Sequence, residues 1–423
     1  MKAPVYHRQT CRLCNSPRTE LVVELAPIPL AEKYVTADQL EEPTELFPVD
    51  LYMCLDCGHV QLLDVIDPEI LWKDYTYHSG QTQGIVAHFQ QVAQEIVGRY
   101  RPPPGSLVVD VGSNDGTLLR AFQAHGLRVL GVDPAEEIAL QATRSGIETL
   151  PHLLTPELAR QIREAHGPAS VVTAFNVFAH ADDMGALADS IRHLLADDGI
   201  FVFEAQYLLD IIDHTLVGTI FHEHLCHHSV KPLLGFLRRH GMEMIDVRRV
   251  TIQHGSIIGT VQRLGGPHPV LRSVPELVAL EEERELDRPQ TLRAFARKLQ
   301  GLRQRAAGLV AEWRSQGKTI AGYGAARSGP TLINQLGLEG AISYIFDDHP
   351  QKVHRYTPGH HIPVVPTAEL YVRRPDVVVI LAWIHARKIL AAHQDYLEQG
   401  GRFMILCPEV EVVGPGQALE VVR

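Results

Sequence analysis

The sequence lacks any run of about 20 apolar residues, and its most apolar segment, residues 377–383, has only strand length. A membrane-spanning helix is therefore not expected. The first residues lack the apolar stretch of a secretory signal peptide, so we expect a cytoplasmic location. Basic residues are in deficit, with 39 Lys and Arg against 50 Asp and Glu, which argues against a nucleic-acid partner. The apolar share of 45% is ordinary for a folded chain, and 423 residues predict two to four domains.

Cysteine is scarce, but four of the six cysteines form two pairs, Cys11 with Cys14 and Cys54 with Cys57. In a reducing compartment a disulfide framework is not favoured. Each Cys-x-x-Cys pair places two thiolates on one tight turn, as tetrahedral zinc requires. Four thiolates leave no open position on the metal, so the pairs predict a structural Zn²⁺. Redox-active pairs and simple buried thiols are the alternatives.

A nucleotide-type unit is predicted in the middle of the chain. After a helix at 85–100, a strand at 107–111 enters a glycine-rich turn, followed by a helix at 118–125 and a strand at 128–132. Asp133 closes the second strand and can hold a ribose hydroxyl pair. The turn contains Gly112 and Gly116, with Asp110 before them, instead of the G-x-G-x-x-G of NAD-binding units. This form favours S-adenosylmethionine (SAM), which has no pyrophosphate; a generic nucleotide-binding unit is the alternative.

The remaining pattern predicts an extended parallel sheet and a second unit of the same type. Strands are expected at 170–175 and 200–204 with a helix at 184–195 between them. The charged segment 276–288 is interpreted as a solvated helix face, before a helix at 292–316. Strands are then expected at 319–324, 341–346, 376–382 and 402–406, and residues 411–423 are interpreted as peripheral. The turn after the first of these strands departs from the dinucleotide pattern, so NAD is not favoured there.

The predicted fold class is α/β with three domains. Residues 1–75 form a small zinc-binding domain, 76–290 a Rossmann-like SAM methyltransferase domain, and 291–423 a second Rossmann-like domain for a nucleotide-containing substrate. Two such units predict that SAM and this substrate meet between them.

A histidine-rich segment is the strongest candidate for chemistry; its histidines are His222, His224, His227 and His228. The zinc motif H-E-x-x-H is absent, because Cys226 stands where its second histidine would be. A histidine can instead take a proton next to a carbonyl, and a carboxylate such as Glu223 can orient it. General base catalysis is therefore the favoured hypothesis, with satisfied core or surface histidines as the alternative. The segment 75–80, YTYHSG, could donate hydrogen bonds to an oxyanion or pack at a domain junction.

Motifs spread over nearly the whole chain carry a resemblance; they are CRLC…CLDCGHVQL, YTYHSG, VVDVGSNDGTLL, FNVFAHADD, FEAQYLLDII, FHEHLCHHSVKPL, GYGAARSGPTLIN, YIFDDHPQKVHRYTPGHHIPV and VVVILAW. Together and in this order they resemble the SAM-dependent sugar C-methyltransferases of deoxysugar biosynthesis. The resemblance implies a zinc domain, a SAM domain and a C-terminal Rossmann-like domain. It also implies a nucleotide-linked 4-keto-6-deoxysugar as substrate, carried by dTDP or GDP and methylated at C3, with C5 as the alternative. The oligomeric state stays open, a monomer included.

The resemblance also implies the roles of individual residues. His224 would be the base, with Glu223 and His222 beside it and Tyr77 near the sugar. SAM would contact Asp110, Gly112, Ser113, Asn114, Asp115, Gly116, Asp133, Asn176 and His180. The nucleotide sugar would contact Tyr207, Gly324, Ala325, Arg327, Ser328, Asp347, Lys352 and Arg355, and the basic side chains among these suit a diphosphate.

Some positions depart from the family pattern. Phe221 stands where the family has Tyr, Arg327 where it has Lys, and Ile384 follows Trp383 in place of Asn. Residues 253–258 lack the family's arginine. These changes predict an altered sugar or nucleotide. Three rival functions are a zinc-ribbon nucleic-acid methyltransferase, a non-catalytic SAM and nucleotide-sugar binding protein, and an NAD-dependent sugar oxidoreductase.

Overall fold

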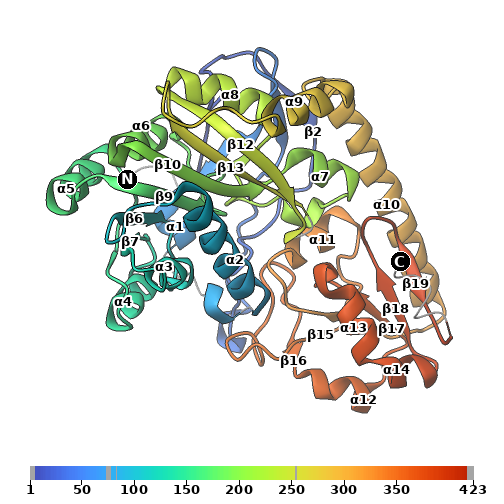
Figure 1. The fold of residues 1–423 in the computed structure, drawn as a ribbon. Helices are drawn as coiled ribbons and strands as arrows, with labels where there is room; N and C mark the ends of the chain where they lie inside the picture. The colour runs from blue at the N-terminus through green and yellow to red at the C-terminus, as the bar shows by residue number, and fades with distance from the viewer. Residues whose placement is uncertain (1–4, 73–77, 82, 253–254, 417–423) are drawn as a thin grey trace.

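The computed structural model describes residues 5–72, 78–81, 83–252 and 255–416, whose strands form four sheets (Figure 1). The mixture of sheets and covering helices confirms the predicted α/β class. No helix within these ranges is long and apolar enough to cross a membrane.

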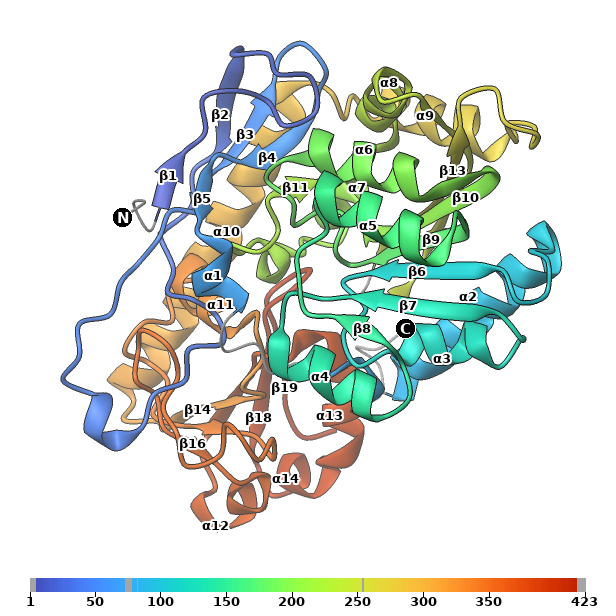
Figure 2. The ribbon, with the colours of Figure 1, turned by 90° about the vertical axis from the view of Figure 1, so that its left-hand side faces the viewer.

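The N-terminal module contains two small antiparallel sheets. One pairs β1 (Val5–His7) with β5 (Asp64–Ile66). The other has the order β11-β4-β3-β2, formed by β2 (Thr19–Val23), β3 (Leu51–Cys54), β4 (Val60–Leu62) and β11 (Cys226–His227). Its edge strand β11 comes from the histidine-rich segment, so this segment is part of the module's sheet (Figure 2).

The central sheet has the strand order β12-β13-β10-β9-β6-β7-β8. Its strands are β6 (Leu107–Val111), β7 (Arg128–Val132), β8 (Thr149–Leu150), β9 (Ala169–Phe175), β10 (Leu195–Gln206), β12 (Met242–Val250) and β13 (Ser256–Arg263). The strands from β10 to β8 run parallel, whereas β13 runs antiparallel to β10, and the edge strand β12 in turn runs antiparallel to β13. The strands β6 and β9 are almost wholly buried, as the inner strands of a sheet covered on both faces should be, and they are apolar apart from a few polar residues such as Asp110 and Thr173.

Helices accompany these strands along the chain. They are α1 (Pro68–Trp72), α2 (Gln83–Tyr100), α3 (Thr117–Gln123), α4 (Glu136–Arg144), α5 (Pro156–His166), α6 (Met184–Leu194), α7 (Leu208–Asp213), α8 (Val230–Arg239) and α9 (Ser273–Glu283). The long helix α10 (Pro289–Ser315) then runs along one side of the molecule toward the C-terminal sheet (Figure 1).

The C-terminal sheet has the order β16-β15-β14-β17-β18-β19. Its strands are β14 (Ile320–Tyr323), β15 (Ile345–Phe346), β16 (Val364–Val365), β17 (Val377–Ile380), β18 (Arg402–Ile405) and β19 (Glu411–Val413), with helices α11 (Gly329–Gln335), α12 (Leu370–Arg373), α13 (Ala386–Ala392) and α14 (Gln394–Glu398). Its five parallel strands follow the same order as the five parallel strands of the central sheet. In both sheets the glycine turn therefore leaves the middle strand at its carboxyl end, where open α/β sheets bind ligands.

Three expectations about the elements were wrong in part. The strand expected at 341–346 spans only Ile345–Phe346. The tail is not peripheral at its start, because β19 pairs with β18 and buries Val413 fully. The charged segment is not wholly solvated, because Glu281 is 2% exposed and accepts hydrogen bonds from Tyr207 and from the first amides of α8. A buried carboxylate is stable there because these donors replace water.

Candidate functional site

The four paired cysteines converge on one point. The Sγ atoms of Cys11 and Cys57 lie 3.7 Å apart, those of Cys14 and Cys54 lie 3.4 Å apart, and all four lie within 4.8 Å of one another. A tetrahedral zinc with Zn–S bonds of about 2.3 Å places its sulfurs about 3.8 Å apart. The donor set and its spacing fit a structural Zn²⁺.

The zinc-binding module supports the histidine-bearing segments. Arg12, between the first two cysteines, is buried and donates through Nε to Asp182 Oδ1 at 3.1 Å. Asp182 belongs to the loop that carries His180. The amide of Leu62 in β4 donates to the carbonyl of Leu225 at 2.9 Å. Contacts from the module therefore reach the loops of both His180 and His224.

The glycine turn of the central unit requires a residue without a side chain at Gly112. Its φ is 72°, a left-handed conformation, and its amide donates to the Val132 carbonyl at 2.7 Å. A Cβ on Gly112 would overlap with the side chain of Val177. The turn is thus held tightly against β7, and Gly116 caps α3 at the other end of the turn.

The carboxylates of Asp110 and Asp133, next to this turn, accept hydrogen bonds from other groups of the protein. Asp133 accepts the amides of Asn114 at 2.8 Å and Ala135 at 2.9 Å. Asp110 accepts the hydroxyl of Thr173 at 2.6 Å, and burial raises the pKa of Asp110 to about 7. These bonds fix the turn and the loop after β7 before any ligand arrives. Ser113 is buried beside the same turn.

The end of the YTYHSG segment docks on the turn. The side-chain oxygen of Asn114 accepts the amide of Ser79 at 2.9 Å, and Asp115 accepts the amide of Gly80 at 2.8 Å. The end of this segment therefore lies against the glycine turn, at Ser79 and Gly80. Tyr77 itself lies outside the described residues.

A buried polar cluster lies at the carboxyl ends of β9 and β10. The side-chain amide of Asn176 donates to Glu204 Oε1 at 3.2 Å, and His88 Nε2 lies 2.5 Å from Glu204 Oε2. Glu204 is fully buried. Sequence reasoning missed His88 and Glu204 as neighbours of Asn176, although Glu204 stands in the motif FEAQYLLDII.

His224 has one ring nitrogen fixed by the backbone. Its Nδ1 lies 2.6 Å from the carbonyl oxygen of Thr219, so in the neutral ring Nδ1 carries the proton and donates it to this acceptor. Its Nε2 then presents a lone pair. Burial lowers the pKa of His224 to about 4, so the ring is neutral near pH 7. The ring stacks on that of His180, with 5.2 Å between the ring centroids, and its centroid lies 4.1 Å from that of Phe221.

His222 and Glu223, which precede His224 in the sequence, bond to other parts of the protein. Nε2 of His222 lies 3.2 Å from the carbonyl of Phe47 in the N-terminal module. Glu223 accepts from Arg327 Nη1 at 2.7 Å, and burial raises its pKa while Arg327 opposes that shift. The Thr219 carbonyl, rather than Glu223, therefore orients the ring of His224.

The C-terminal unit repeats the construction of the first turn. The amide of Gly324 donates to the Phe346 carbonyl at 2.8 Å, and a Cβ on Gly324 would overlap with Ala382. Asp347 accepts the amides of Ala325 and His349, both at 2.7 Å. This matches Asp133 with its two amides, so both units brace the turn with the acid that closes their second strand.

The predicted substrate residues divide into two groups. Lys352 Nζ donates to the carbonyl of Ala325 at 3.0 Å, which places it at the turn together with Arg327. Ser328 begins α11 at the same turn, and Arg355 is exposed. Tyr207 is fully buried, and its hydroxyl donates to Glu281 at 3.0 Å. The structure thus brings together the turn residues, whereas Tyr207 lies in the core.

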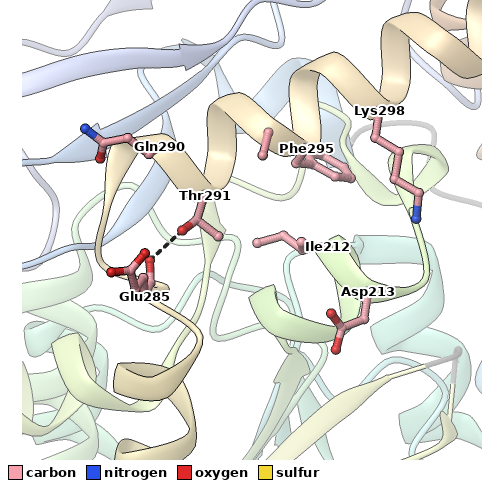
Figure 3. Close-up of a pocket in the computed structure, with 8 residues that line it drawn as sticks. Ile212, Asp213, Glu285, Gln290, Thr291, Phe295 and Lys298 are labelled. Atoms are coloured by element: carbon pink, nitrogen blue, oxygen red, sulfur yellow. Dashed lines mark hydrogen bonds between the residues drawn. The ribbon is translucent and has the colours of Figure 1, made fainter.

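One cavity, of about 490 Å³, lies away from these residues (Figure 3). It is lined by Ile212, Asp213, Glu285, Gln290, Thr291, Ala294, Phe295 and Lys298, from α7, α10 and the loop before α10. None of the predicted site residues is among them, so this cavity is not the candidate site.

Comparisons with known proteins cover nearly the whole chain. Family models match residues 11–72 ("Putative zinc binding domain"), 86–247 ("Methyltransferase domain") and 251–408 ("C-methyltransferase C-terminal domain"). The C-methyltransferase NovU of Streptomyces niveus is 32% identical over 410 residues, which cover 97% of this chain and 98% of NovU.

Two similar solved structures each cover less than half of this chain. Magnesium protoporphyrin IX methyltransferase of Synechocystis, solved with bound SAH, is 20% identical with a TM-score of 0.33, covering 46% of this chain and 91% of its own. The PH0226 protein of Pyrococcus horikoshii is 13% identical with a TM-score of 0.37, and the match covers 44% of this chain and 95% of PH0226.

Proposed function

This chain belongs to the C-methyltransferase family and depends on SAM, and on that premise we propose that its acceptor is a nucleotide-linked 4-keto-6-deoxysugar. The carrier is dTDP or GDP, and the methylated carbon is C3, with C5 as the alternative. The observation that carries the proposal is the neutral ring of His224, whose Nδ1 is fixed by Thr219 so that Nε2 can act as a base.

The reaction begins with proton removal. A 4-keto group acidifies the C–H bonds beside it, so Nε2 of His224 takes a proton from the neighbouring carbon and the C–H electron pair becomes part of an enolate. The turn of Gly112 would hold SAM, whose methyl group would form a bond to the carbon that has lost its proton; the electron pair of the broken S–CH3 bond would remain on sulfur, which leaves as S-adenosylhomocysteine. The negative charge of the enolate favours the protonated ring, which compensates for the low pKa of His224.

The other residues position the reactants. Asp110, Asp133, Asn114 and their neighbours shape the SAM turn, and Asn176 and His180 would contact SAM. Phe221 and His180 lie against the ring of His224 and limit the access of water to it. Tyr77 would donate a hydrogen bond to the sugar.

The C-terminal unit would hold the nucleotide. Arg327 and Lys352 lie at its glycine turn, and Arg355 is exposed nearby in the sequence, so the three side chains can neutralise a diphosphate. Arg327 also contacts Glu223, beside the proposed base, and so joins the two halves of the site.

Mass spectrometry tests this function. The protein is incubated with dTDP- and GDP-linked 4-keto-6-deoxysugars in deuterated water, with and without SAM. A mass gain of one methyl group with SAM, and deuterium uptake without it, are the expected results. SAM binding without methylation or exchange of any of these sugars would contradict the proposal.

A further inference from the structure

A carboxylate from the N-terminal module contacts both cations of the proposed diphosphate site. Glu32, in the segment between β2 and β3, places Oε1 3.3 Å from Nε of Arg327 and Oε2 3.2 Å from Nζ of Lys352. The three side chains are largely buried, with exposed fractions of 16%, 22% and 12%. Glu32 thus pairs with the two positive charges that the C-terminal unit would offer to a ligand.

The segment that carries Glu32 is anchored on the C-terminal unit on both sides. Ala26 exchanges two hydrogen bonds with the side-chain amide of Gln335, at 2.9 and 2.7 Å. Val35 pairs with Tyr356 in an antiparallel bridge, and the hydroxyl of Tyr34 donates to the carbonyl of Ala325 at 2.9 Å. The backbone around Glu32 is therefore fixed, and its side chain alone can swing away from the cations.

The charges of Arg327 and Lys352 are already offset without a ligand, since the two cations face Glu32 and Glu223. Asp347 adds a third carboxylate at the same turn. A diphosphate adds at least two negative charges, and like charges at short range repel one another. Glu223 is held by a bond of 2.7 Å and is 7% exposed, whereas the contacts of Glu32 are 3.2 to 3.4 Å long. Glu32 is the carboxylate held more loosely, so it yields first.

We propose that Glu32 is a specificity-determining residue that competes with the substrate diphosphate for Arg327 and Lys352, and that its side chain withdraws when the diphosphate binds. The inference rests on the proposed function, because it takes the nucleotide to enter at these cations. A ligand reaches Arg327 and Lys352 only if its negative charge attracts them more strongly than the carboxylate of Glu32 does. Uncharged nucleosides, which cannot displace Glu32, are excluded from the cations.

Calorimetric titration of the zinc-loaded full chain tests the competition. The ligands are dTDP, GDP, inorganic pyrophosphate, uncharged thymidine and SAM, and the variant Glu32→Gln removes the charge at nearly constant size. The matched control is Glu42→Gln, at an exposed acid of the same segment. We expect the Kd of the diphosphates and pyrophosphate to fall about tenfold in Glu32→Gln, equivalent to about 1.4 kcal/mol. The affinities for thymidine and SAM, and those of the control, should not change.

The outcomes separate this inference from the proposed function. If wild-type protein binds dTDP or GDP and Glu32→Gln binds it equally or more weakly, the role of Glu32 is wrong and the nucleotide site stands. If pyrophosphate binds Glu32→Gln more tightly than the wild type while neither nucleotide binds, the competition is correct and the nucleotide carrier is wrong. If none of these anions binds either protein, both are wrong. Glu32→Asp, which shortens the side chain and should also tighten binding, replaces Glu32→Gln if the latter fails to fold.

Discussion

Replacement of His224 by Asn gives the sharpest test of the proposed base. The side-chain amide of Asn can reproduce the donor at Nδ1, which bonds the Thr219 carbonyl at 2.6 Å, but it has no atom at the position of Nε2. The variant thus removes the base and keeps the contact that orients the side chain. The ring contacts with His180 and Phe221 are lost, at a stability cost of about 1 kcal/mol.

The expected effect on the rate follows from the role. A general base contributes about 10²- to 10⁴-fold, and at about 1.36 kcal/mol per tenfold this raises the barrier by about 2.7 to 5.4 kcal/mol. The affinity for SAM should stay within about twofold, because the turn at Gly112 is braced independently by Asp133. Turnover and deuterium uptake by the keto sugar without SAM are measured side by side.

The matched control is His125→Asn, at an exposed histidine between α3 and β7. We expect it to leave both rates unchanged. If His224→Asn keeps turnover within about tenfold of the wild type, a barrier change of only about 1.4 kcal/mol, then His224 is not the main base. Persistent deuterium uptake in the variant would lead to the same conclusion.

Three further predictions concern buried titratable groups and the metal site. The histidines of residues 222–228 have their pKa values lowered to about 3 or 4 by burial, so the unfolded chain binds more protons below about pH 6.5. Thermal melting should therefore show stability present above that pH and lost progressively as the pH falls toward 4; a flat profile would contradict this. Cys14→Ser should lower the zinc content measured by atomic absorption, along with the yield of folded protein, and a fully folded zinc-free variant would oppose a structural role for the metal. Arg327→Gln should destabilise the protein by about 3–5 kcal/mol because it leaves Glu223 buried without this partner, and a double-mutant cycle with Glu223→Gln should recover most of that loss.

Much of the fold could be predicted because its signals are local. The predicted strands at 107–111 and 128–132 coincide with β6 and β7, because strands buried on both faces are mostly apolar and so stand out in the sequence. The cysteine pairs were found because the spacing of zinc ligands is visible in the sequence. The error at Glu281 arose because partners distant in sequence decide its burial, whereas β19 was missed although its partner β18 directly precedes it in the chain.

The candidate site was less predictable, because the partners of its residues are backbone atoms or side chains distant in sequence. The acceptor that orients His224 is a backbone carbonyl, and backbone atoms have no signature in the sequence. Glu32 belongs to the module that carries the zinc cysteines, and its contacts at Arg327 and Lys352 are about 300 residues away. Only the three-dimensional arrangement shows that Glu223 faces Arg327 rather than its neighbour His224.

The pairing of β11 with β4 has a consequence for how the protein is made. A ribosome releases the cysteine pairs and strands β2 to β4 long before Cys226 and His227, which complete their sheet. Until then the edge of β4 offers unpaired backbone groups to any passing strand, which is a recognised route to aggregation. A fragment that ends near residue 75 would keep this edge permanently open. Recombinant work on the isolated zinc module should therefore supply β11 as a fused segment or a peptide.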